Sequence, residues 1–105
     1  MEFVEVPIFT SVIANLLDEY AQRELQDELL GNPARGNLIK GSGGLRKLRF
    51  SASGHGKRGG VRIIYYLRSE SRIYLVFAYA KAKQEDMSPE QLKVLRQLVA
   101  LIKEE

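Results

Sequence analysis

Cationic side chains recur on three segments of this chain that alternate like β-strands. Lys47 and Arg49 are separated by one residue in the first segment, Arg62 lies in the second, and Lys81 directly follows the third. Neighbouring strands of a sheet lie about 4.8 Å apart, so cations on three of them can converge on one phosphate. Such a cluster is typical of a site that binds phosphate and stabilises the charge that develops on it.

Two further side chains belong to this group by position. Tyr79 ends the third segment two residues before Lys81, where we expect it to stack on a nucleic-acid base, and Lys83 follows just beyond. The plain alternative is a solvated basic face of a sheet, with the tyrosine in the core. Arg62 favours a functional site, because it precedes an apolar run in which a charged side chain is normally held by a partner or a ligand.

The charge around these residues is unevenly distributed. Residues 31–69 contain nine Lys and Arg and no Asp or Glu, whereas the rest of the chain carries seven basic against thirteen acidic residues. The modest net charge of +3 therefore hides a strongly basic block in an acidic frame. Concentrated positive charge attracts polyanions, of which nucleic-acid phosphate backbones are the commonest.

A glycine-rich stretch in this block matches the phosphate-loop pattern of kinases from Gly54 to Val61. We reject that interpretation, because 105 residues cannot hold a kinase core and no helix follows the glycines. The stretch is better interpreted as a basic hairpin loop, with Lys57 and Arg58, whose glycines let backbone N–H groups approach phosphate. His55 lies in the same loop and is a candidate general base, although the sequence offers it no partner.

The composition narrows the class of protein. A chain of 105 residues with 45% apolar residues predicts one globular domain over residues 1–105. With no cysteine and one histidine, we expect no disulfide, no metal site and no cofactor. No apolar run approaches the roughly 20 residues that span a bilayer, and the N-terminus does not read as a signal peptide, so we expect a cytoplasmic protein without membrane contact.

The hydrophobic periodicity predicts an α+β fold in the order β-α-α-β-β-β-α. Strict alternation on the last strand would put Ile73, Leu75, Phe77 and Tyr79 on one face. Glu85 and Asp86 are interpreted as an exposed linker before the last helix, which should begin at the N-cap Ser88. We therefore expect a mainly antiparallel sheet covered by helices. The expected elements are a strand at 3–6, helices at about 8–17 and 19–30, strands at 45–50, 61–67 and 72–80, and a helix from 89 to near the C-terminus.

Three stretches together resemble a known family. They are GSGGLRKLR at 41–49, GKRGGVRIIYY at 56–66 and YAK at 79–81. They are similar to the HigB branch of the RelE toxin superfamily, whose RelE-like microbial RNase fold has the element order expected here. The resemblance covers nearly the whole chain.

The resemblance implies the toxin of a type II toxin–antitoxin pair, inhibited by a HigA-like helix-turn-helix antitoxin. Such toxins enter the ribosomal A site and cleave mRNA without a metal, through attack of an RNA 2′-hydroxyl on the adjacent phosphate. It also implies catalytic roles for Lys47, Arg49, Arg62, Tyr79 and Lys81, with Arg62 on the scissile phosphate. Contacts with mRNA and ribosomal RNA would come from Arg46, Lys57, Arg58 and Lys83.

Two points stay open from the sequence. Ala80 and Ala82 flank Lys81 where many relatives carry Arg, His or Tyr, so the general acid and base are not assigned. The basic block is equally consistent with a non-catalytic nucleic-acid-binding module, or a degenerate toxin that acts through a basic sheet face.

Overall fold

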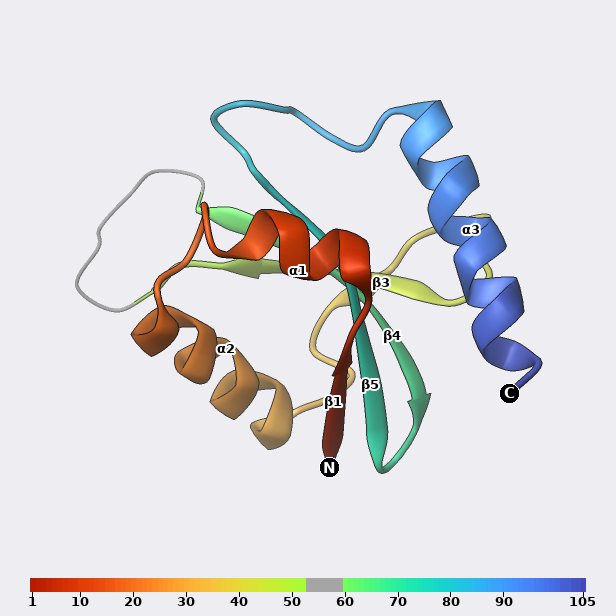
Figure 1. Cartoon of the computed structure of the whole chain (residues 1–105), viewed down its shortest axis with the longest axis horizontal. Helices are drawn as coiled ribbons and strands as arrows, with labels where there is room; N and C mark the ends of the chain where they lie inside the picture. The colour runs from red at the N-terminus through yellow and green to blue at the C-terminus, as the bar shows by residue number, and fades with distance from the viewer. Residues whose placement is uncertain (53–59) are drawn as a thin grey trace.

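A computed structural model describes residues 1–52 and 60–105 and shows an α+β fold (Figure 1). The element order agrees with the expected one except for one additional strand, β2, of only two residues. The elements are β1 (Glu2–Glu5), α1 (Pro7–Ile13), α2 (Glu19–Gly31), β2 (Asn37–Leu38), β3 (Leu45–Phe50), β4 (Val61–Ser69), β5 (Arg72–Ala80) and α3 (Pro89–Lys103).

The described strands form one five-stranded sheet in the order β1-β5-β4-β3-β2. The pairs β5–β4, β4–β3 and β3–β2 are antiparallel, whereas β1 lies parallel to β5 at one edge. The three strands predicted to carry the cations are therefore adjacent at the centre of the sheet. Such neighbours present cross-strand side-chain pairs on a common face.

Helices α1 and α2 cover one face of the sheet, on the side opposite α3 (Figure 1). Phe9 and Ile13 of α1 and Leu25 and Leu29 of α2 are buried against it. Full burial of one such side chain contributes about 1.5–3 kcal/mol. The strands supply the other half of this layer, which includes Leu48, Phe50, Ile63, Tyr65, Ile73, Leu75 and Ala78.

Helix α3 covers part of the opposite face and starts with the capping box that its sequence predicts. The Ser88 hydroxyl accepts a hydrogen bond from the Gln91 backbone N–H at 3.1 Å, and the Gln91 side chain accepts one from the Ser88 backbone N–H at 2.9 Å. Leu95 and Val99 pack against Ile64 and Val76 of the sheet. Because α3 starts well after β5 ends, residues 81–88 cross the end of the sheet before the helix begins.

A β-bulge in β5 corrects the predicted facing of that strand. Tyr65 pairs with Leu75 and Ile64 pairs with Phe77, so Val76 is an extra residue without an opposite partner. The alternation therefore shifts after Leu75, and Phe77 lies on the α3 face with Val76. The strict alternation expected from the sequence is wrong beyond this point.

None of the helices in residues 1–52 and 60–105 is long and apolar enough to cross a lipid bilayer.

Candidate active site

A row of three predicted site residues crosses the centre of the sheet. Arg49 of β3 is directly opposite Arg62 of β4, and Arg62 is directly opposite Tyr79 of β5. Residues directly opposite one another on neighbouring strands project from the same face of the sheet. The bulge at Val76 is what places Tyr79 on this face, which is the α3 face.

The side chains of this row become more buried from Arg49 to Tyr79. Arg49 is exposed, whereas Arg62 is 6% exposed and Tyr79 is 5% exposed. The Tyr79 ring packs with the α3-side core and leaves no open face for a base, which is against the expectation that it stacks on one. Two like charges directly opposite each other oppose folding. A phosphate bound over Arg49 and Arg62 would reduce that repulsion.

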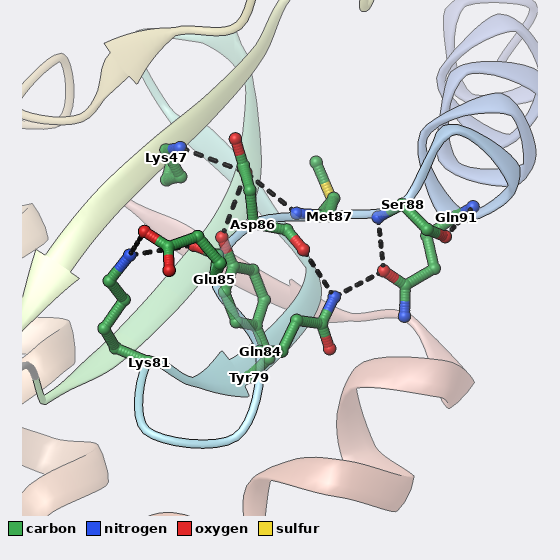
Figure 2. A network of polar contacts seen from close by, with 9 residues as sticks. All are labelled: Lys47, Tyr79, Lys81, Gln84, Glu85, Asp86, Met87, Ser88 and Gln91. Atoms are coloured by element: carbon green, nitrogen blue, oxygen red, sulfur yellow. Dashed lines mark hydrogen bonds and ion pairs between the residues drawn. The ribbon is translucent and has the colours of Figure 1, made fainter.

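Lys47 lies on the same face one row along β3, and its ammonium group contacts an acid from a distant part of the chain. Lys47 Nζ is 3.2 Å from Asp86 Oδ1 (Figure 2). The Tyr79 hydroxyl donates to the same oxygen at 3.3 Å, and the Met87 backbone N–H donates to it at 2.8 Å. Asp86 therefore joins the Lys47 row to the Tyr79 row.

Lys81 is held beside this cluster by contacts with both backbone and side chains. Its backbone N–H donates to the carbonyl of Gly60, the residue before β4, at 3.2 Å. Its ammonium group is 2.9 Å from the Glu85 carboxylate and donates to the Glu85 carbonyl at 3.1 Å (Figure 2). These three contacts fix Lys81 at the end of the sheet where β4 begins at Val61.

Residues 84–91 form a connected turn that fixes the position of Asp86 (Figure 2). The Gln84 side-chain amide donates to the Asp86 carbonyl at 3.0 Å and to the Gln91 side-chain oxygen at 2.6 Å. Gln91 is also the N3 residue of the α3 capping box with Ser88. The start of α3 is thus tied to the carboxylate that contacts Lys47 and Tyr79.

The protonation states of this cluster follow from its surroundings. Burial, reinforced by the negative charge and hydrogen bond of Asp86, raises the pKa of Tyr79 to about 12 against a smaller opposing effect of Arg62. The Met87 N–H first, and then Lys47 and Tyr79, lower the pKa of Asp86. At neutral pH the tyrosine is therefore a neutral hydroxyl and the aspartate is an anion.

The structure does not bring every predicted site residue to this cluster. Arg46 donates instead to the carbonyls of Ala34 and Gly36, at 3.1 and 2.8 Å, in the segment that follows α2. Lys83 borders a separate hollow of about 340 Å³ between the α1–α2 connection and the sheet end. His55, Lys57 and Arg58 lie outside the described residues.

Glu85 and Asp86 form an exposed linker between β5 and α3, as the sequence predicts, but the prediction did not include their contacts with Lys47 and Lys81. Both side chains are exposed, but each forms an ion pair with a predicted catalytic lysine. One signal was available: the two acids lie close after Lys81, just beyond a strong cation cluster. The contact with Lys47 spans 39 residues, and only the tertiary structure reveals it.

No group of three or more His, Asp or Glu in residues 1–52 and 60–105 is arranged to hold a metal ion.

Comparison with family models gives a match, over residues 15–104, to the RelE toxin of the RelE/RelB toxin–antitoxin system. The matched range contains the whole cluster from Lys47 to Asp86 and all elements from α2 onward. Membership implies a toxin that is paired with an antitoxin. The fold and the matched range together show that this chain belongs to the RelE toxin family.

Proposed function

We propose that this toxin is a ribosome-dependent, metal-independent mRNA endonuclease of the HigB-like branch, which stops translation in the cytoplasm. In this reaction the 2′-hydroxyl of one nucleotide attacks the adjacent phosphate in the ribosomal A site. The products are a cyclic phosphate and a 5′-hydroxyl end. We further propose a HigA-like helix-turn-helix protein as its antitoxin.

The observation that carries this proposal is the Arg49–Arg62–Tyr79 row across β3, β4 and β5. Two guanidinium groups on one sheet face suit the phosphorane, where negative charge increases during attack. Guanidinium also binds phosphate through two parallel N–H groups, which orients it as well as neutralises it. We assign Arg62 to the scissile phosphate, because it lies at the centre of the row.

The neighbouring groups supply the remaining interactions. Lys47 and Lys81 add positive charge, while the neutral Tyr79 hydroxyl donates to Asp86 and helps to fix the carboxylate that pairs with Lys47. Arg46, Lys57, Arg58 and Lys83 remain predicted contacts to mRNA and ribosomal RNA.

Purified protein added to an in vitro translation reaction tests the proposal. The message is recovered and its new 5′ ends are mapped; we expect discrete cuts in translated codons and none without ribosomes. Arg62→Ala should slow cleavage by about 10²–10³-fold, the loss typical when one charge-stabilising donor is removed. Arg23→Ala is the matched control, because it removes the same charge from an exposed position on α2.

A binding module would give a different pattern. The message would stay intact, and Arg62→Ala would weaken RNA binding and reduce the salt dependence of that binding. Intact message in the presence of wild-type protein would therefore refute the endonuclease proposal.

A further inference from the structure

The proposed reaction needs a group that accepts the proton of the attacking 2′-hydroxyl. Lysine and arginine side chains offer hydrogen-bond donors, and Lys47 and Lys81 donate to the carboxylates of Asp86 and Glu85. Tyr79 keeps its proton, since its pKa is raised to about 12. Among the described side chains of the cluster, the anionic groups are the carboxylates of Glu85 and Asp86.

The two carboxylates differ in their exposure and in the side chains that they contact. The Glu85 side chain is 92% exposed, and within the described part of the chain its ion pair is with Lys81. Asp86 contacts side chains of two sheet strands, Lys47 and Tyr79, and its carboxylate is fixed by the Met87 N–H. A group that is fixed before the substrate arrives loses less entropy on reaction than a mobile one.

We propose that Asp86 is the general base of the cleavage reaction and takes the 2′-hydroxyl proton; this inference rests on the proposed endonuclease function. Among residues 1–52 and 60–105, the three hydrogen bonds to the Asp86 carboxylate all reach Oδ1, and Oδ2 accepts none of these three. The side chain is 63% exposed, which leaves Oδ2 accessible to a bound RNA. Asp86 contacts Tyr79 at one end of the row, and Tyr79 is directly opposite Arg62, over which the phosphate is expected.

The step balances in atoms and charge. The 2′-hydroxyl proton moves to the Asp86 carboxylate, the 2′-oxygen forms a bond to phosphorus, and the bond from phosphorus to the 5′-oxygen breaks. The leaving 5′-oxygen takes a proton from a cationic donor of the site, for which Lys81 is placed at the sheet end. Exchange with water restores the carboxylate and the ammonium group.

The groups that face Asp86 set its behaviour with pH. They are Lys47 from β3, Tyr79 from β5, and the negatively charged Glu85 from its own loop. Because its pKa is lowered, the Asp86 carboxylate stays ionised throughout the pH range of the ribosome assay. A base of this kind gives a cleavage rate that does not fall between pH 8 and 5.5. A histidine base gives a rate that falls about tenfold for each pH unit below its pKa of about 6.5.

The test measures single-turnover cleavage on ribosomes carrying a defined mRNA, at pH values from 5.5 to 8. Asp86→Asn keeps an oxygen that can accept the Met87 and Tyr79 hydrogen bonds but cannot take the proton. We expect this variant to be about 10²–10⁴-fold slower, the usual contribution of a general base. Asp86→Glu should restore part of the rate. Asp27→Asn, which removes an equal charge from an exposed position on α2, should cleave like wild type.

Binding separates a lost base from a lost fold. On ribosomes whose mRNA carries a 2′-deoxy nucleotide at the cleavage position, Asp86→Asn should bind as well as wild type or more tightly, because a negative charge has left a cationic site. Cleavage by Asp86→Asn at or above the wild-type rate would overturn the assignment, as would a wild-type rate that falls as expected for histidine. Absence of any cleavage by wild type would overturn the proposed function and this inference together.

Discussion

Tyr79 should make the folded protein sensitive to alkaline pH in a way that one substitution removes. Its pKa is about 12 in the folded chain, against about 10 for a tyrosine in the unfolded chain. A raised pKa in the folded state stabilises folding while the hydroxyl is neutral. That stabilisation is complete below pH 10 and is lost as the pH rises through about 12. Two pKa units correspond to about 2.7 kcal/mol, of which about 1.4 kcal/mol is lost by pH 11.

The assay is guanidinium unfolding of wild type and Tyr79→Phe at pH 8, 10 and 11. Phenylalanine fills the same buried site without an ionisable group, so the free-energy difference between the two proteins isolates Tyr79 from other titrating side chains. We expect this difference to shift by about 1.4 kcal/mol in favour of Tyr79→Phe between pH 8 and 11. A difference that does not change with pH would refute the account of a neutral, buried tyrosine in the site.

Two further substitutions test the elements that position the cluster. Gly60→Ala should destabilise the fold by at least 2 kcal/mol in chemical unfolding, because Gly60 has φ +56° and an added Cβ would lie 2.4 Å from the Phe50 carbonyl oxygen. Gly31→Ala is its control: an added Cβ at this helical position meets nothing within 4 Å, so the variant should be neutral or up to about 1 kcal/mol more stable. Ser88→Ala removes the N-cap acceptor of the Gln91 N–H and should cost about 1 kcal/mol, read from the denaturation midpoint; an unchanged midpoint would contradict the cap.

The fold was largely predictable because most of its elements carry strong local signals. The alternation of Leu48 and Phe50 with Lys47 and Arg49 on β3 is confirmed, since the first pair packs under α1 and α2. The α3 capping box from Ser88 is confirmed as well. Strand β2 was missed, because two residues between glycine-rich turns show no periodicity.

The site was less predictable, because its contacts join residues that are far apart in the sequence. Lys47 and Asp86 are 39 positions apart, and nothing in their local sequences indicates that they meet. The isolated pattern of a Glu–Asp pair before a helix is typical of a solvated linker. The structure confirms that the pair is exposed and adds what the pattern does not indicate: the turn tied to Gln91 holds the Asp86 carboxylate beside Lys47 and Tyr79.

Placement of Tyr79 shows how one residue decides the composition of the site. Ile73 and Tyr79 are six positions apart, so strict alternation puts them on the same face, against α1 and α2. Val76 adds one unpaired residue to β5, and Tyr79 lies instead opposite Arg62 on the α3 face. Without the bulge, Tyr79 would lie on the other face, the row would contain only Arg49 and Arg62, and the Tyr79 hydroxyl would not contact Asp86. Bulges reorient side chains next to functional sites in many sheets, and an apolar strand such as β5 gives no local sign of one.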